Sequence, residues 1–188
     1  MILSDRDIKK EIKSKNIVIK PHPNFEEQLS SCSLDLKLGR EFRVFQYSVL
    51  PFIDIKKPIP DGLTSLIKLK NGEPFILQPG EFVLASTEEW VELSSKIAAR
   101  LEGRSSIGRL GVIVHATASV VSPGWRGNIT LELGNIGRMA VALHPGMRVC
   151  ALSFEYLTSE AEVPYHKNKL SKYAGQHGVA ASKIDQEI

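Results

Sequence analysis

The sequence predicts a mainly β fold, a sandwich or barrel formed by a single domain. Short apolar runs recur at intervals of about 8–12 residues along most of the chain, which is typical of such folds. Two of the breaks between runs are Pro-Gly turns, Pro79-Gly80 and Pro145-Gly146, and each lies between two apolar runs. We interpret these two similar units as matching corners of one β roll.

The elements can be expected in order along the chain. Ser4 followed by Asp7 forms a capping box and predicts a short amphipathic helix over residues 4–14. Residues 33–38 alternate apolar and polar side chains with the period of a half-buried strand, which we expect to end at Gly39. The remaining expected strands lie at 17–19, 42–45, 52–55, 75–77, 82–85, 90–93, 97–101, 128–133, 140–143 and 148–154. Prolines and glycines over residues 56–74 predict irregular loops.

Composition restricts the class of protein. The 188 residues are 43% hydrophobic and 24% charged, so the chain is globular and long enough to bury a core. The net charge of +3 is small and its basic residues are scattered, which argues against a nucleic-acid partner. No apolar run approaches the roughly 20 residues of a membrane span, and the N-terminus lacks a signal-peptide pattern. We expect a cytoplasmic protein in which Cys32 and Cys150 are buried free thiols.

The stretch from Glu102 to Glu132 has the highest density of polar chemistry. Its first part carries two arginines and two hydroxyl groups, namely Arg104, Ser105, Ser106 and Arg109. Arginine offers planar bidentate donors that stay charged, and a serine ahead of a short helix leaves main-chain N–H groups free for phosphate oxygens. The residues therefore indicate an oxyanion site, above all one for a polyphosphate. The alternative is an arginine-rich turn held by surface ion pairs.

Glu132 is the carboxylate of most interest. In the run Ile129-Thr-Leu-Glu-Leu133 it lies on one strand face, while Leu131 and Leu133 take the other. If its face lines a buried pocket, Glu132 suits general acid–base chemistry. If that face meets solvent, Glu132 is an ordinary outward-facing strand residue.

Several other chemistries are excluded by the motifs. Zinc nucleobase deaminases need H-x-E with P-C-x-x-C, whereas the central histidine here begins His115-Ala-Thr117 and no cysteine pair exists. The chain also lacks a P-loop, a G-x-G-x-x-G turn and a G-x-S-x-G elbow. We therefore expect no metal ligated by the protein.

The last segment, residues 164–188, turns polar. A solvated tail is the default for such an ending. The alternative is a lid over a nucleotide, because aromatic, cationic and amide groups recur along the segment. These groups are Tyr165, Lys172, Tyr173 and Gln176.

Taken together, the motifs resemble the dCTP deaminase family of the trimeric dUTPase superfamily. The matching segments are ILSDRDI, SLDLKLG, GRSSIGRLG, HATA followed by PGW, ITLE, LHPGM and PYHKNKLSKYAGQHG. They cover nearly the whole chain. The resemblance implies a distorted β roll over residues 1–188, with 164–188 as the lid, assembled as a homotrimer with shared active sites.

The same resemblance implies a reaction and a role for each site residue. Members convert dCTP and water to dUTP and ammonia without zinc, with Mg²⁺ carried on the triphosphate, and dTTP inhibits relatives by feedback. Glu132 would be the proton shuttle, Ser105 would position the water, and Arg109 would stabilise the charged intermediate and meet phosphate. The other implied contacts are Arg104 and Ser106 to phosphate, the main chain near Thr130 and Leu131 to the base, and Tyr165, Lys172 and Gln176 to the triphosphate.

One position departs from the family pattern. Ser122 stands before Pro-Gly-Trp, where the family usually carries an aspartate that bonds the deoxyribose 3′-hydroxyl. Losing a hydrogen bond to a charged group costs about 1.5–3 kcal/mol, so sugar recognition and any dUTPase activity are expected to weaken. Ala151 occupies a position where dual-activity relatives tend to carry glutamine, which also indicates weak dUTPase activity. We expect dUTP as the product. The alternatives are a bifunctional enzyme that gives dUMP and diphosphate, and a catalytically weak nucleotide sensor.

Overall fold

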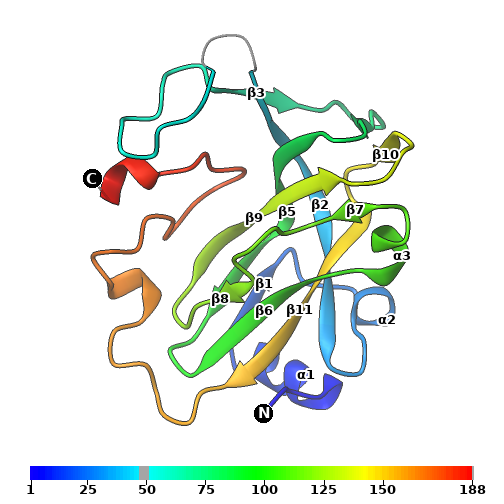
Figure 1. Ribbon diagram of the computed structural model, residues 1–188. Helices are drawn as coiled ribbons and strands as arrows, with labels where there is room; N and C mark the ends of the chain where they lie inside the picture. Colours follow the sequence, from blue (N-terminus) through cyan, green and yellow to red (C-terminus); the bar gives the residue numbers. More distant parts are fainter. Residues whose placement is uncertain (47–50, 188) are drawn as a thin grey trace.

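The computed structural model describes residues 1–46 and 51–187, and most of its regular structure is antiparallel β-sheet (Figure 1). The strands are β1 (Ile17–Lys20), β2 (Ser33–Phe45), β3 (Thr64–Lys68), β4 (Phe75–Leu77), β5 (Phe82–Leu93), β6 (Ile97–Gly103), β7 (Val112–Ile113), β8 (Val120–Val121), β9 (Arg126–Asn135), β10 (Val141–Leu143) and β11 (Arg148–Tyr156). Nine of these described strands form one sheet in the order β7-β9-β5-β2-β11-β6-β8, with β1 beside β5 and β3 beside β2. The sheet curls on itself, which confirms the predicted mainly β fold.

Helices in the described residues are short and lie at the edges of the sheet. They are α1 (Asp5–Lys13), α2 (Phe25–Gln28), α3 (Ser105–Gly108), and the 3₁₀ turns Tyr165–Lys167 and Ile184–Glu187. The Asp7 N–H donates to Ser4 Oγ at 3.3 Å, which confirms the predicted N-terminal cap. Ile8, one helical turn on, is fully buried. The apolar face of α1 therefore fixes the N-terminus to the sheet.

The two Pro-Gly units, interpreted above as matching corners of one β roll, pair with each other. β4 pairs with β10 in an antiparallel two-stranded sheet, with Val141 opposite Leu77 and Leu143 opposite Phe75. The turn at Pro79-Gly80 leads from β4 into β5, and the turn at Pro145-Gly146 leads from β10 into β11. The corners of the roll are thus joined to each other directly.

Gly39 does not end a strand, contrary to the sequence prediction. β2 continues through it to Phe45, with a register shift against β5 between Leu38 and Phe42. A Cβ atom at Gly39 would lie 2.8 Å from the main-chain oxygen of Ser86. The glycine therefore allows a close approach of β5 at an irregularity in the sheet, rather than a chain reversal.

Other strand boundaries also differ from the prediction. The expected strands at 82–85 and 90–93 are one strand, β5, whereas residues 52–55 form no strand. β3 was not predicted because its side chains are half-buried or exposed and lack apolar alternation; pairing with β2 holds it in place.

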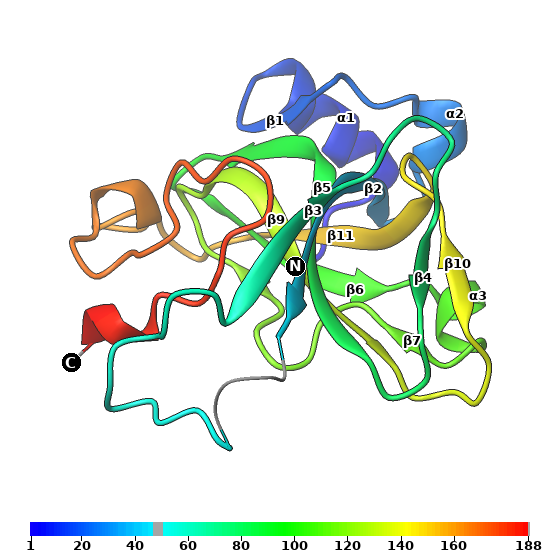
Figure 2. The same cartoon turned by 90° about the horizontal axis from the view of Figure 1, so that it is seen from above.

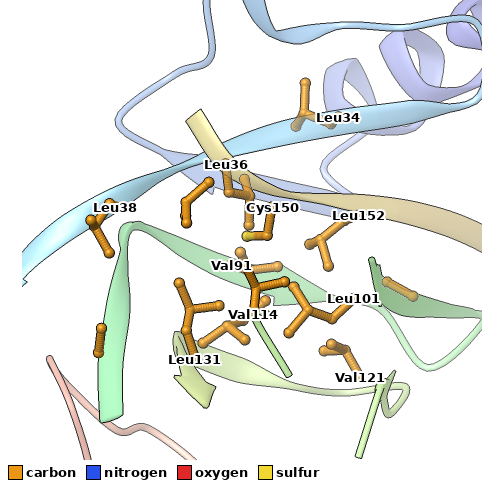
Figure 3. Close-up of a cluster of buried hydrophobic side chains, with 14 of the residues drawn as sticks. Leu34, Leu36, Leu38, Val91, Leu101, Val114, Val121, Leu131, Cys150 and Leu152 are labelled. Carbon is orange, nitrogen blue, oxygen red and sulfur yellow. The ribbon is translucent and has the colours of Figure 1, made fainter. Parts of the chain in front are cut away.

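The core lies inside the curl of the sheet. Figure 3 shows side chains of β2 and β11, among them Leu36 and Leu152, pointing toward Leu101 of β6 and Leu131 of β9. Cys150 is buried in this core, as expected, but Cys32 is exposed. Cys32 stands in the bend between α2 and β2, where no apolar layer covers it.

The C-terminal segment returns to the sheet after β11. Figures 1 and 2 show it running alongside β9, and Gln176 forms a parallel bridge with Gly127 at the start of that strand. Among the described residues, no helix is both long and apolar enough to cross a membrane.

Candidate active site

A cavity of about 350 Å³ lies between β9, the preceding turn and the C-terminal segment. Five of the predicted site residues line it: Ser122, Thr130, Glu132, Tyr165 and Gln176. No lysine, arginine or histidine of the described chain is part of this lining. The cavity therefore offers one carboxylate and several neutral polar groups, together with the faces of aromatic rings.

Glu132 points into this cavity because of the alternation along β9. Its neighbours Leu131 and Leu133 are fully buried in the core on the opposite face. The Ala116 N–H donates to Glu132 Oε2 at 2.8 Å, and the Glu132 N–H donates to the Val114 carbonyl at 3.1 Å. The loop that follows β7 thus fixes one carboxylate oxygen, while the other is available to a ligand.

Thr130 lies on the same face of β9, two residues away. The side-chain amide of Gln176 reaches it from the C-terminal segment, and Nε2 donates to Thr130 Oγ1 at 3.1 Å and to the Asn128 carbonyl at 2.6 Å. Gln176 Oε1 is buried and has no hydrogen-bond partner among the described residues. A buried acceptor of this kind favours a donor supplied by a ligand.

The two main-chain positions expected to read a base are not equivalent. The main-chain groups of Asn128 and Glu132 point away from β5, since they bond Gln176 and Val114. Groups on alternate residues share one edge of a strand, so those of Thr130 point to the same edge. The groups of Leu131 face β5, where its partner is Ala85. Thr130, rather than Leu131, presents its N–H and C=O at the cavity edge.

The turn at Ser122-Pro-Gly-Trp125 joins the cavity to the C-terminal segment. The Trp125 N–H donates to the Ser122 carbonyl at 3.0 Å, and Gly124 has a φ of 79°. The Tyr165 N–H donates to the Pro123 carbonyl at 2.8 Å, and the Trp125 and Tyr165 rings lie 5.3 Å apart. The segment is therefore anchored on this turn before it crosses the cavity.

Two tyrosines of the C-terminal segment face the cavity. Tyr165 Oη accepts a hydrogen bond from the Tyr173 N–H at 3.4 Å, and burial raises the pKa of Tyr165. Tyr173 was named in the tail pattern but not among the expected substrate contacts. Lys172, which was expected to meet the triphosphate, is half-buried beside it and lies outside the lining. Its carbonyl accepts a hydrogen bond from Lys183 Nζ at 2.6 Å.

The predicted phosphate loop lies elsewhere. Arg104, Ser105 and Ser106 line a separate polar pocket of about 370 Å³ at the junction of β2, β6 and β11. Ser105 is the first residue of α3 and Arg104 is its N-cap, so no serine precedes the helix as expected. Because α3 is a single turn, most of the positive charge in this pocket comes from arginine side chains.

Asp35 and Arg148 complete this second pocket, and the sequence reading named neither. Asp35 Oδ2 lies 3.0 Å from Arg104 Nε and 3.4 Å from Arg148 Nη1. Burial raises the pKa of Asp35, while the two guanidinium groups oppose the rise. The polar position of Asp35 in the alternating strand, and the place of Arg148 directly after the Pro-Gly turn, were the available signals.

Most of the predicted site residues thus lie in two separate pockets of the chain, one around Glu132 and one around Arg104. Arg109 lines neither pocket and is exposed at the end of α3. In the part of the chain that the structure describes, no three His, Cys, Asp or Glu side chains gather closely enough to hold a metal ion. The neutral donors and acceptors around Glu132 suit an uncharged polar group, and the arginines of the second pocket suit an anion.

Comparison with known proteins shows which family the chain resembles. The family model described as dCTP deaminase-like matches residues 2–157. The chain is 51% identical over 190 residues to dCTP deaminase from Thermomicrobium roseum, an alignment that covers 100% of this chain and 96% of the relative. It is also 51% identical over 185 residues to "dCTP deaminase, dUMP-forming" from Dictyoglomus turgidum, covering 98% and 95%.

The fold is shared with solved structures. The crystal structure of 2′-deoxycytidine 5′-triphosphate deaminase from Agrobacterium tumefaciens superposes with a TM-score of 0.64 at 21% identity. The match covers 83% of this chain and 48% of the other, so the chain spans about half the length of that solved protein.

Proposed function

Since the chain belongs to the dCTP deaminase-like family, we propose that it is a hydrolase that deaminates dCTP to dUTP and ammonia. The observation that carries the proposal is Glu132, whose carboxylate is held in the cavity by the Ala116 N–H. The unpaired Gln176 Oε1 and the main-chain edge at Thr130 add the neutral polar groups that a pyrimidine ring and its sugar require.

In the proposed reaction, Glu132 accepts a proton from water as the oxygen adds to C4 of cytosine. The carboxyl group then delivers that proton to the exocyclic amine, the C4–N bond breaks, and ammonia leaves. Ser105 and Arg109, supplied by a neighbouring copy of the chain, position the water and stabilise charge on the ring. The N–H of Ala116 keeps the carboxylate in one orientation throughout, which favours transfer along a fixed path.

We further propose a homotrimer in which neighbouring subunits complete each site. A triphosphate carries several negative charges, and the cavity around Glu132 has no cationic residue in its described lining. Arg104, Ser105, Ser106 and Arg109 lie too far round the fold to line it. A second copy of the chain would bring its arginine loop to the phosphates.

The C-terminal segment, residues 164–188, acts as a lid within a single domain spanning residues 1–188. Tyr165, Lys172 and Gln176 cover the nucleotide. Mg²⁺ would enter bound to the triphosphate and would offset part of its negative charge. We expect dTTP to inhibit by competing for the same cavity, and the enzyme to act in the cytoplasm without nucleic acid.

The proposed product is dUTP because of two residues of this chain. Ser122 lines the cavity where the family usually offers a carboxylate, and Ala151 lies in the arginine pocket without a polar side chain. The competing candidate releases dUMP and diphosphate, as the name of the D. turgidum relative indicates for that protein. Equal identity to both relatives does not separate the two products.

The product test is incubation with dCTP and Mg²⁺ in zinc-free buffer, with dUTP, dUMP, ammonia and diphosphate resolved together. Equal amounts of dUTP and ammonia without diphosphate support the proposal. Diphosphate formed in step with ammonia would replace it with the dUMP-forming reaction. Tight dCTP binding without any product would favour the remaining alternative, a nucleotide sensor.

Ser122→Asp tests the role of the substituted position. The added carboxylate would accept a hydrogen bond from the sugar hydroxyl, worth about 1.5–3 kcal/mol. We expect a KM for dCTP about ten- to a hundredfold lower, with dUTP still the main product. An unchanged KM would remove Ser122 from the sugar site.

A further inference from the structure

The second pocket contains two guanidinium groups arranged around one carboxylate. Arg104 uses Nε toward Asp35 and Nη1 toward the Arg148 carbonyl, at 3.0 Å each. Arg148 uses Nη1 toward both Asp35 and the Glu27 carbonyl. No hydrogen bond to a described residue occupies Nη2 of either arginine. Both side chains therefore keep donors for an anion in the pocket.

Asp35 and Arg148 lie on the adjacent strands β2 and β11, and Arg104 directly follows β6, which fixes their relative positions. β2, β11 and β6 are neighbours in the sheet, with Arg148 opposite Lys37 and Cys150 opposite Gly103. The main-chain carbonyl of Asp35 accepts a hydrogen bond from Gln28 Nε2 at 2.9 Å. This bond holds the backbone of β2 at Asp35, the residue that carries the carboxylate.

We propose that Arg148 is a further polyphosphate-binding residue beside Arg104, and that Asp35 is the positioning residue that holds both guanidinium groups toward the ligand. The inference rests on the proposed function, in which this pocket receives the triphosphate of the nucleotide. Two guanidinium groups so close together repel each other, and Asp35 offsets that repulsion. Glu27 also lines the pocket, so its two positive charges face two negative ones, and an anion depends on the directed donors of the arginines. Two forked donors then meet phosphate oxygens in a fixed orientation.

The first test measures binding of inorganic tripolyphosphate to the full-length protein by calorimetry. We expect Arg148→Gln to weaken tripolyphosphate binding about ten- to a hundredfold, since each hydrogen bond to a charged group contributes strongly. Binding of deoxycytidine, which has no phosphate, stays unchanged. The matched control is Arg100→Gln, which removes an equal charge from an arginine of β6 that pairs with Glu155. Equal losses in the two variants, or none for Arg148→Gln, would overturn the proposal.

The second test separates positioning from simple electrostatics. Asp35→Asn removes a negative charge from the pocket, so a purely electrostatic role predicts tighter binding of tripolyphosphate. A positioning role predicts weaker binding, about tenfold, with recovery in Asp35→Glu, because the guanidinium groups lose their common partner. Tighter or unchanged binding refutes the role of Asp35. Should Asp35→Asn not fold, the same comparison is made with Asp35→Ser, which also removes the carboxylate and must weaken tripolyphosphate binding without changing deoxycytidine affinity.

The kinetic readout distinguishes this proposal from the proposed function. If the protein deaminates dCTP, Arg148→Gln raises KM far more than it lowers kcat. If no deamination occurs but tripolyphosphate still binds through Arg148, the pocket stands and only the reaction fails. If the protein binds tripolyphosphate through Arg148 but does not bind deoxycytidine, the proposed function likewise fails while the phosphate pocket stands.

Discussion

At the scale of single residues, the proposed chemistry depends on strand alternation at Glu132. Its neighbours on both sides are core leucines, so a shift of β9 by one residue would bury the carboxylate and expose two leucines. The fixed register with β5 prevents that shift. The sequence predicted the face of Glu132 correctly but left open whether that face was solvent or cavity, because the C-terminal segment that encloses it is distant in the chain.

Glu132→Gln is expected to lower kcat by about 10²–10⁴, the usual contribution of a general acid–base group. The amide keeps the shape of the carboxylate but transfers no proton. The dissociation constant for dCTP should stay within about threefold, because the phosphate and sugar contacts are retained. Ammonia release and calorimetry measure the two quantities. Glu162→Gln, at an exposed glutamate, serves as the control, and near-normal turnover in Glu132→Gln would exclude the assigned role.

Gly124 carries a second constraint at residue scale. Its φ of 79° is strained for other residues, and a Cβ would lie 2.5 Å from Pro164 Cβ. Gly124→Ala should therefore loosen the C-terminal segment, with faster proteolysis after residue 164 and a higher KM. Gly146→Ala is the matched control, since Gly146 has a φ of 83° but open space around its Cβ position. Equal proteolysis in the two variants would show that backbone strain, and not the contact with Pro164, accounts for the effect.

At the scale of elements, local signals predicted the strands better than their pairing. The helix cap at Ser4 and the Pro-Gly corners follow from short-range chemistry and were confirmed. Gly39 was misread because a glycine within a strand and a glycine that ends one look alike until the partner strand is known. β3 has no apolar pattern of its own, so its strand structure depends on β2.

Glu89 joins three elements and makes stability depend on pH. It is buried on β5, and its carboxylate accepts hydrogen bonds from Gln28 of α2 at 2.9 Å and from the Lys37 N–H of β2 at 2.8 Å. Burial raises the pKa of Glu89, against the opposing effect of these hydrogen bonds. Protonation is therefore easier in the folded state than in the unfolded state. This contribution to stability is complete below the unfolded pKa and is lost as pH rises through the folded value.

Glu89→Gln is expected to remove that dependence. The free energy of unfolding of the wild type should lose a contribution as pH rises from the ordinary glutamate range toward neutrality, while the variant loses none there. Urea unfolding at a series of pH values measures both curves. Parallel curves would mean that Glu89 titrates alike in the folded and unfolded states.

At the scale of the whole molecule, the sequence predicted which residues form the candidate site but not how they are arranged in space. Arg104 and Glu132 are close in sequence, yet the sheet carries them to different pockets, because β6 and β9 lie far apart in its strand order. Arg148 and Asp35 were missed for the converse reason, since only long-range pairing brings them to Arg104.

Subunit mixing tests the shared site. Glu132→Gln and Arg109→Ala subunits, each inactive alone, should regain about a quarter of wild-type activity when mixed equally and reassembled. That fraction is expected if each site takes its glutamate and its arginine from different chains. Mixtures without activity would place both residues in the same subunit's site.

The bridge between Gln176 and Gly127 has a consequence beyond catalysis. The C-terminal segment covers main-chain groups at the start of β9, and the Gln176 carbonyl and side chain bond both polar groups of Asn128. Whenever the segment lifts, this part of β9 becomes a bare sheet edge, the kind of surface on which chains add strands to one another. The segment proposed as a lid would thus also protect the protein against aggregation, and a chain truncated before residue 164 should precipitate at concentrations the full chain tolerates.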